Sequence, residues 1–565
     1  MAGPLRVRWL GRVAYDEALA LQRGLFDHGH DQHLLLLEHP PVYTLGVRAS
    51  TDNVLVDPAD VGATLVWTDR GGDVTYHGPG QLVGYPILTL PPKRGAGSGL
   101  ADTVAYVQSV EQVLIDALAD LGLPGCGRLR RYPGVWVDPD GEHPRKIAAI
   151  GVRLSRGRTM HGFALNVSTD LSMFGHIIPC GIVGKAVTSL HAEGLDVTLQ
   201  QAADAVAARA AIAWGGGTVE RQDVAWRHRP DDLSAFSRGA GPGAVVRDAS
   251  QHLNDRLAQV GVVGGLQIST RKPEWLRPKV HHGPEVLALK RAVRELDLVT
   301  VCEEAGCPNL SECWADGTAT FMVLGERCTR ACGFCLVDTR RPLAVDHSEP
   351  ERVAEAVDRL GLDHAVLTMV ARDDLADGGL GLVAETVASI RRRRPATTVE
   401  TLISDAKGDA ASLEILVAAR PDVLNHNLET VARLQRAVRP SAGYARSLAL
   451  LARAKAAGLT TKSGLIVGMG ETDAEVVGAL ADLAGIGVDI VTVGQYLRPT
   501  THHLPVARWV PPAAFAGYKA AGEAFGIGHV EASPLTRSSY HAKQAAAHVG
   551  TTAVLPAPAD GLSFA

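Results

Sequence analysis

The chain has 565 residues, of which 46% are hydrophobic and 21% charged, and its formal net charge at pH 7 is −5. At roughly 150 residues per domain, this length corresponds to about three or four domains, or to fewer if one is a barrel. The composition excludes a disordered or collagen-like chain, and the slightly acidic balance argues against bulk nucleic-acid binding. No apolar run approaches the roughly 18 residues of a membrane span. Arg6, Arg8 and Arg12 interrupt the N-terminus before an apolar signal segment can form, so we expect a cytoplasmic protein without a membrane partner.

Residues 1–226 mix helices and strands without regular alternation. Apolar side chains recur at three- and four-residue spacing over 15–26 and 103–121, which predicts two amphipathic helices. Strands are predicted over 81–90, 134–137, 147–154 and 159–167. A short polar segment, 155–158, joins the last two strands as a hairpin. This part is therefore predicted to be an α+β domain.

Residues 227–264 are rich in Arg, Asp, Ser and Gly, which predicts a linker with a short helix near 253–260. In the remaining domain, 265–565, apolar strands alternate with helices. Strands are predicted over 321–324, 364–370, 397–403, 422–427, 461–467 and 488–496. Such alternation predicts a parallel sheet with crossover helices, closed fully or partly as a barrel, with its chemistry at the C-terminal ends of the strands.

Six of the eight cysteines lie within 34 residues, from Cys302 to Cys335. A cytosolic chain is kept reduced, so this cluster indicates metal ligation or catalysis rather than disulfides. Cys328, Cys332 and Cys335 have the spacing C-x3-C-x2-C and directly follow the first barrel strand. Three thiolates on one loop can hold three irons of a [4Fe–4S] cluster and leave the fourth iron open to a ligand. A zinc site is the alternative, but it would need a fourth Cys or His ligand and pairs spaced C-x2-C.

This spacing resembles that of the radical S-adenosylmethionine (SAM) enzymes, in which the open iron binds the methionine moiety and the cluster cleaves SAM to a radical. A second triple, Cys302, Cys307 and Cys313, precedes the barrel and is also one ligand short. Further segments are RKPEWLR (271–277), ARDDLADGG (371–379), NHNLET (425–430), SGLIVGMGET (463–472), VGQYLRPT (493–500) and RSSYHA (537–542). With the two cysteine triples, they make residues 265–550 resemble lipoyl synthase.

The resemblance implies two [4Fe–4S] clusters. The triple Cys328, Cys332 and Cys335 would hold the SAM cluster, and the triple Cys302, Cys307 and Cys313 an auxiliary cluster that the family consumes as its sulfur source. A serine of RSSY would complete the auxiliary cluster; of Ser538 and Ser539 we prefer Ser539. A hydroxyl oxygen is a hard ligand on soft iron and should leave more readily than a thiolate. The electron donor would be a protein such as flavodoxin or ferredoxin. Residues expected to bind SAM or the peptide substrate are Asp373, Asp374, Gly378, Gly379, Asn425, Asn427, Gln495 and Arg498.

The first half carries a second resemblance. Its segments are LLLLEHPPVYTLG (34–46), RGGDVTYHGPGQLVGYPIL (70–88), RKIAAIGV (145–152) and HGFALNVSTDLSMFGHIIPCGI (161–182). They resemble lipoyl(octanoyl) transferase, which has the α+β fold of the biotin and lipoate protein ligases. That family moves octanoate from octanoyl-acyl carrier protein to a lysine of a lipoyl carrier domain, as found in 2-oxoacid dehydrogenases and the glycine cleavage H protein.

A thioester donor needs a thiolate nucleophile, and this half has two lone cysteines, Cys126 and Cys180. The residues alone do not decide between them. The resemblance assigns Cys180 as the nucleophile and Lys146 as its acid/base partner; Cys126 keeps the interpretation of an inert small hydrophobe. A cationic lysine lowers the thiol pKa and, once neutral, accepts a proton from the attacking amine. Expected substrate-binding residues are Arg70, Gly71, Gly72, Asp73, Val74, Thr75, Tyr76, His77, Ala149, Ile150, Gly151, His161, Gly162, Phe163 and Ala164.

The two resemblances together imply a bifunctional enzyme of lipoate biosynthesis. The first half would attach octanoate to the carrier lysine, and the second would insert sulfur at C6 and C8 of the bound chain. Two alternatives remain open: the same folds with another radical SAM sulfur insertion such as methylthiolation, or a non-catalytic iron–sulfur or zinc module fused to an acyl-carrier-binding domain.

Overall fold

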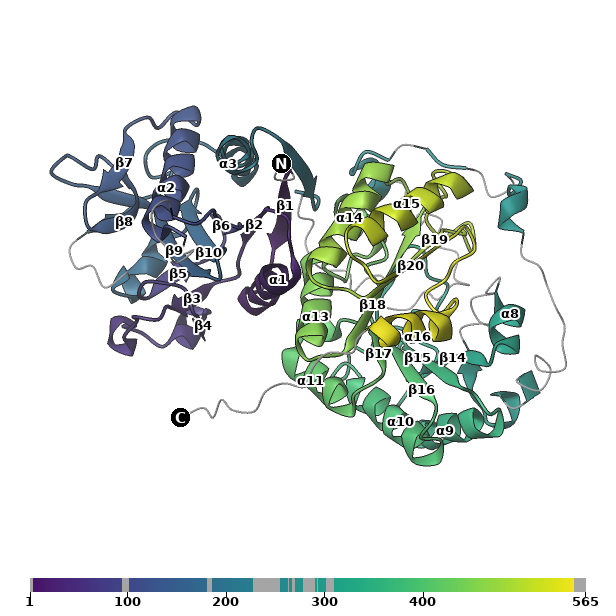
Figure 1. The fold of residues 1–565 in the computed structure, drawn as a ribbon. Coiled ribbons are helices and arrows are strands. Elements are labelled where there is room, and N and C mark those ends of the chain that lie inside the picture. The colour runs from purple at the N-terminus through teal and green to yellow at the C-terminus, as the bar shows by residue number, and fades with distance from the viewer. Residues whose placement is uncertain are drawn as a thin grey trace.

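The computed structural model describes residues 4–93, 101–179, 185–226, 255–262, 264–266, 270–277, 290–291, 293–300 and 309–552. Of the predicted site residues, Cys180, Cys302 and Cys307 lie outside these ranges. Two lobes are visible, each built around its own sheet (Figure 1). In the described ranges, the membrane-span criteria of length and apolar character are met by none of the helices.

The first lobe is built on a mixed sheet of nine strands among the described residues. Its strand order is β12-β1-β2-β6-β10-β9-β8-β7, with β11 paired to β9. The bounds are β1 Leu5–Arg12, β2 His33–Glu38, β6 Gln81–Ile87, β7 Cys126–Leu129, β8 Tyr132–Val137, β9 Arg145–Ser155, β10 Arg158–Asn166, β11 Ala186–Val187 and β12 Val219–Asp223. The predicted hairpin is confirmed, because β9 and β10 pair antiparallel with Ser155 opposite Arg158. Arg156 and Gly157 make its turn with φ of 52° and 74°.

Three helices and a small second sheet complete this lobe. The helices are α1 Tyr15–His28, α2 Thr103–Asp120 and α3 Leu199–Trp214, and the sheet contains β3 Val42–Leu45, β4 Thr64–Trp67 and β5 Thr75–His77. N-cap side chains fix the starts of two of these helices. Asp102 accepts from backbone N–H groups at the start of α2, and Thr198 forms a capping box with Gln201 at the start of α3. The predicted α+β domain is confirmed.

The second lobe is a curved sheet with the order β13-β14-β15-β16-β17-β18-β19-β20, parallel from β14 onward. The bounds are β13 Val299–Thr300, β14 Thr318–Val323, β15 His364–Met369, β16 Thr398–Leu402, β17 Val423–Asn425, β18 Thr460–Val467, β19 Ile490–Gln495 and β20 His529–Ala532. The helices are α8 Leu310–Ala315, α9 Glu349–Arg359, α10 Leu380–Arg393, α11 Ala410–Ala419, α12 Gln435–Val438, α13 Tyr444–Ala456, α14 Asp473–Gly485, α15 Pro512–Ala524 and α16 Ala542–Thr552. The six predicted strands are present as β14 to β19, which confirms the partial parallel barrel. β20 is an additional parallel strand, short and only partly buried.

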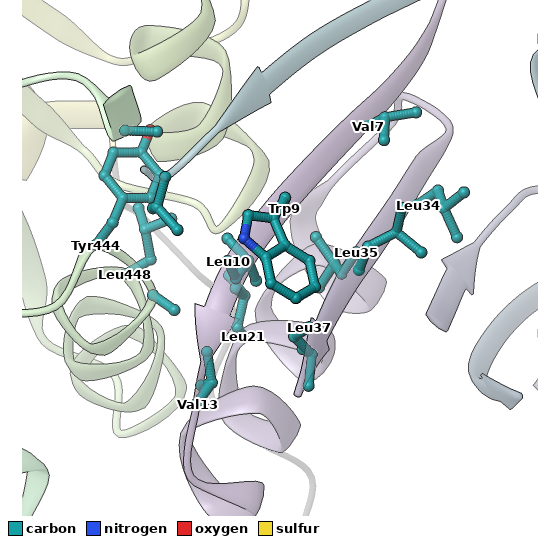
Figure 2. Close-up of a cluster of buried hydrophobic side chains, with 14 of the residues drawn as sticks. Val7, Trp9, Leu10, Val13, Leu21, Leu34, Leu35, Leu37, Tyr444 and Leu448 are labelled. Carbon is teal, nitrogen blue, oxygen red and sulfur yellow. The ribbon is translucent and has the colours of Figure 1, made fainter. Parts of the chain in front are cut away.

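Apolar packing joins the two lobes. Helix α1 packs against α13 and α14, and β12 packs against α14 (Figure 1). Gly24 of α1 lies so close to α13 that a Cβ there would be 2.9 Å from the Ala452 Cβ. Figure 2 shows Leu10 and Leu21 of the first lobe with Tyr444 and Leu448 of α13 in one cluster of buried side chains. The lobes therefore share a continuous core.

A buried polar contact crosses the same interface. Arg8 of β1 and Asp482 of α14 have side chains only 2% and 6% exposed, and Arg8 Nε lies 2.9 Å from both Asp482 carboxylate oxygens. Tyr444 donates its hydroxyl to Asp482 at 2.8 Å, and Glu220 pairs with Arg8 at 2.7 Å. Arg8 is thus a buried charge within a strand, and carboxylates from distant parts of the chain compensate it.

The predicted linker lies largely outside the described residues. In its C-terminal part, residues 255–258 form a helical turn whose Leu257 is buried in the shared core. Arg256 donates to the backbone carbonyls of Arg436 and Ala437 at 2.8 and 2.6 Å. This part of the segment is therefore packed on the second lobe.

Candidate active sites

The first lobe contains an open cavity of about 470 Å³. The loop before β5 contributes Arg70 to Asp73, and strands β5, β9 and β10 contribute the rest of the predicted lining. The predicted residues that line it are Arg70, Gly71, Gly72, Asp73, Thr75, His77, Ala149, Ile150, Gly151, His161, Gly162, Phe163 and Ala164. Tyr15 and Tyr85 also line it and were not predicted. Val74 and Tyr76 instead belong to a separate apolar cluster with Phe174, because successive side chains of a strand alternate between its faces.

Glycine allows strands β6 and β10 to pack closely beside this cavity. A Cβ at Gly162 would collide with the Gly84 carbonyl oxygen, and a Cβ at Gly84 would collide with the Phe163 ring. Side chains are therefore excluded at both positions, and the backbone itself forms part of the cavity wall.

Buried imidazoles lie at the cavity: His77 and His161 line it, and His39 contacts Tyr85, which also lines it. His77 Nδ1 lies 2.8 Å from Gln81 Oε1, and His161 Nε2 lies 2.7 Å from Asp69 Oδ1. His39 Nε2 lies 2.7 Å from the hydroxyl of Tyr85. Burial lowers the pKa of His77 to about 3 and that of His39 to about 4, so both are neutral near pH 7. Both ring nitrogens of His39 and of His77 have protein partners, whereas His161 Nδ1 is buried without one among the described residues, so it is the ring nitrogen available to a ligand.

Lys146 lies in a second cavity, of about 280 Å³, that adjoins the first. Thr75, Ala149 and Ala164 line both cavities. Lys146 Nζ donates to the Pro133 carbonyl at 3.1 Å and lies 4.9 Å from the centroid of the Trp136 ring. Pro179, which directly precedes Cys180, lines the same cavity.

Cys126, the other lone cysteine, occupies a different environment. It begins β7, opposite Val137 of β8, and packs on the main core of the lobe. Burial, with a contribution from Glu193, raises the pKa of Cys126 to about 11. A thiol of this pKa is a weak source of thiolate at neutral pH.

In the second lobe, Cys328, Cys332 and Cys335 follow β14 directly, as predicted. Backbone contacts fix their loop: Cys328 N–H donates to Asp338 O at 2.8 Å, and His503 Nε2 lies 2.9 Å from Cys335 O. Burial raises the pKa of Cys332 to about 11 and, together with the field of Cys332, that of Cys335 to about 12. Three neighbouring thiols on one loop fit an iron–sulfur cluster, whose binding displaces their protons. Each thiolate of a cluster binds a different iron, and within the described residues no three His, Cys, Asp or Glu side chains converge on a single ion.

An arginine of the cysteine loop is held by two carboxylates. Arg330 makes two hydrogen bonds of 2.8 Å to Asp373, after β15, and one of 2.5 Å to Asp405, after β16. Asp374 pairs instead with Arg372. The loop that carries Cys328 and Cys332 is therefore tied to the next two strands of the barrel.

Gly378 and Gly379 have φ of 62° and 87°, which favours glycine, and Gly379 precedes α10. A Cβ at Gly378 would lie 2.8 Å from the Ala406 Cβ, and one at Gly379 would lie 2.5 Å from Leu324 Cδ1. The two glycines therefore allow the segment after β15 to pack closely against Ala406 and Leu324.

Asn425 and Asn427, at the end of β17, meet the RSSY segment. Asn425 Nδ2 donates to Ser538 Oγ at 2.9 Å, and Ser538 Oγ donates to Asn427 Oδ1 at 3.0 Å. Asn425 also donates to the buried Glu400 at 2.7 Å. Ser539 makes no side-chain hydrogen bond to a described residue.

The RSSY segment also contacts the helix that carries Cys313. Tyr540 donates to Glu312 of α8 at 3.1 Å, and Asn309, just before α8, donates to the Leu535 carbonyl at 2.7 Å. The structure therefore brings Cys313 and the two candidate serines into one region.

Gln495 ends β19 and Arg498 follows it, and both side chains bind neighbouring backbone. Gln495 donates to the Tyr496 and Arg508 carbonyls and accepts from Val510 N–H. Arg498 donates to the carbonyls of Thr501 and His503. Their polar groups hold the segment after β19 in this structure.

Comparison with known proteins finds a family match in each lobe. Residues 14–211 match the lipoyl protein ligase A/B catalytic domain family, and residues 322–483 match the radical SAM superfamily. The chain is 53% identical over 275 residues to lipoyl synthase of Rubrobacter xylanophilus, covering 48% of this chain and 86% of that protein. It is 52% identical over 284 residues to lipoyl synthase of Nocardia farcinica, covering 50% and 81%. A solved bipartite lipoate protein ligase from Thermoplasma acidophilum is 17% identical, with a TM-score of 0.33 and coverage of 40% of this chain and 86% of that one. The chain therefore belongs to the lipoyl synthase family, as a radical SAM enzyme of lipoate biosynthesis whose first half matches the lipoyl protein ligase A/B catalytic domain family.

Proposed function

We propose that the chain makes protein-bound lipoate in two steps: the first domain transfers octanoate to a carrier lysine, and the second inserts two sulfurs at C6 and C8. The observation that carries this proposal is the pair of adjoining cavities. Lys146 and Pro179 line one, the predicted substrate residues line the other, and Thr75, Ala149 and Ala164 belong to both. An acyl chain in the larger cavity would present its carbonyl to Cys180 and Lys146.

The transfer chemistry then follows from the two side chains. Lys146 in its charged form stabilises the Cys180 thiolate, which attacks the thioester of octanoyl-acyl carrier protein. Lys146 then gives its proton to the departing carrier thiolate, which leaves as the thiol. The amine of the lipoyl-domain lysine next attacks the acyl-cysteine, neutral Lys146 accepts the amine proton, and Cys180 is released as the octanoyl amide forms. His161, oriented by Asp69, lines the larger cavity, where it would contact the bound acyl chain.

In the second domain, Cys328, Cys332 and Cys335 would hold a [4Fe–4S] cluster whose open iron binds SAM, and a donor such as flavodoxin or ferredoxin would reduce it. When bound, this group supplies the electron that cleaves SAM, and an auxiliary cluster supplies the sulfur. Cys302, Cys307 and Cys313 would hold the auxiliary cluster. Ser538 is engaged by Asn425 and Asn427, which leaves the Ser539 hydroxyl as the better candidate for its remaining ligand.

Two cysteine variants test the first step. Cys180→Ala should abolish octanoyl transfer to an apo lipoyl domain, read by mass, because no thiolate remains to take the acyl group. Cys126→Ala is the matched control and should retain transfer, since Cys126 packs on the core away from both cavities. Retained transfer in Cys180→Ala would remove Cys180 from the mechanism.

Two further variants divide the roles of the cysteine triples. Cys332→Ala should stop reductive SAM cleavage, whereas Cys307→Ala should permit cleavage but no sulfur insertion into a pre-octanoylated peptide. Anaerobic iron analysis should give about eight irons per chain for the intact protein and about four for either variant. Equal loss of cleavage in both folded variants would contradict this division, and zinc in place of iron would contradict the radical chemistry.

A further inference from the structure

Residues 405–409, the loop between β16 and α11, contact the cysteine loop, which carries Cys328, Cys332 and Cys335. Asp405 Oδ1 accepts from Arg330 at 2.5 Å, and Lys407 Nζ donates to the backbone carbonyl of Asp373 at 2.7 Å. Arg330 lies between Cys328 and Cys332 in the sequence, and its N–H lies 3.4 Å from Cys328 Sγ. A displacement of loop 405–409 would therefore be transmitted directly to the cysteine loop.

This loop has an unfavourable backbone. Ala406, Lys407 and Gly408 have φ of 42°, 57° and 85°, three successive residues in the left-handed region. For a residue other than glycine this conformation is unfavourable. Such a segment persists only where the surrounding structure holds it in place. Arg330 and Lys407 provide that support on the barrel side.

The support on the other side comes from the first domain. Glu17, in the first turn of α1, has a side chain only 6% exposed and lies 2.6 Å from Arg446 Nε of α13. A Cβ on Gly408 would collide with the Glu17 carboxylate, so α1 rests directly on the loop. Arg453 donates to the Gly408 carbonyl at 3.1 Å.

The positive charges of Arg330 and Arg446 act on Asp405. Its side chain is buried, and Oδ2 has no hydrogen-bond partner in the described part of the chain. Burial opposes ionisation of Asp405, but Arg330, with a contribution from Arg446, lowers its pKa to about 2. Arg446 pairs with Glu17 through Nε, while Asp405 pairs with Arg330.

We propose that Glu17, a residue of the transferase domain, is a positioning residue for the radical SAM site. It fixes Arg446 and loop 405–409, and so keeps Asp405 on Arg330 and the cysteine loop in place. The inference rests on the proposed SAM chemistry of the second domain. The contact between the two domains would then have a structural role in the second reaction.

The test compares Glu17→Gln with the intact full-length holoenzyme. Glu17→Gln should raise the KM for SAM or slow SAM cleavage by about 3- to 30-fold, the range of coupling through such networks. The electron paramagnetic resonance spectrum of the reduced cluster with SAM should change. Octanoyl transfer by the same preparation should stay within about twofold. Gly408→Ala should give the same changes from the loop side, and the double variant should be less than additive, because both act on one contact.

The control variant is Gln222→Ala, which removes a hydrogen bond of 3.3 Å to the Ala474 carbonyl elsewhere in the interface. It should leave SAM cleavage and the spectrum unchanged. Normal cleavage and spectrum in Glu17→Gln would overturn the proposal, as would an equal defect in Gln222→Ala, which would assign the effect to domain packing in general. If the intact enzyme does not cleave SAM, the proposed function itself fails.

Discussion

Asp482 is a buried charge at the contact between the two domains. Its carboxylate accepts from Arg8 Nε at 2.9 Å and from Tyr444 at 2.8 Å. Asp482→Ala removes both acceptors and leaves the Arg8 guanidinium, only 2% exposed, with Glu220 as its remaining carboxylate. Breaking a buried ion pair costs about 3–5 kcal/mol. Because Glu220 still compensates part of the charge, we expect about 3 kcal/mol, which is roughly a 150-fold weaker domain contact.

The assay is anaerobic differential scanning calorimetry of the full chain. Domains that share a core should unfold together, whereas weakened contact should separate the transition into two and lower at least one midpoint. The double variant Arg8→Met/Asp482→Ala should recover much of the loss, since it removes the uncompensated charge as well. Asp363→Ala is the control, because Asp363 pairs with Lys543 on the surface with 61% of its side chain exposed. An Asp482→Ala variant that unfolds like the intact protein, or a double variant no better than the single one, would refute the reasoning.

Three other outcomes are expected. Lys146→Ala should lose octanoyl transfer, measured by mass, while SAM cleavage persists; transfer at the normal rate would exclude Lys146. Glu400 is fully buried, and although burial opposes its ionisation, Lys462 and His364 lower its pKa to about 2 from 4.5. Its stabilisation is present above pH 4.5 and lost as the pH falls toward 2, so Glu400→Gln should be less stable in urea at pH 7 and lose less on acidification. Gly162→Ala should destabilise the first domain by about 1–3 kcal/mol through collision with the Gly84 carbonyl, whereas Gly175→Ala, with open space around it, should not; equal midpoints would contradict that geometry.

The sequence predicts most elements because local periodicity determines them. The six barrel strands and the hairpin of β9 and β10 follow from apolar runs and turn residues. Most of the predicted cavity residues are brought together because two of their segments are neighbouring strands, β9 and β10. Tyr15 and Tyr85 were missed, since a tyrosine at the start of an amphipathic helix or within a strand carries no local sign of a ligand.

Long-range charge pairs could not be predicted in the same way. The sequence shows Arg8 only as a charge that interrupts the N-terminus, yet it is buried in β1, where its partners Glu220 and Asp482 come from more than 200 residues away. Gln495 shows another limit of prediction from sequence. A position at a strand end predicts the region of a side chain but not its direction, and this amide bonds to the backbone of residues 508 and 510.

The most direct test of the account is anaerobic turnover of the intact chain with octanoyl-acyl carrier protein, an apo lipoyl domain, SAM and reductant, followed by mass analysis of the lipoyl domain. We expect the octanoylated domain first, and then a species in which two sulfurs have replaced two hydrogens of the octanoyl chain. A domain that stays octanoylated while SAM is cleaved, or that gains a methylthio group, would contradict the account.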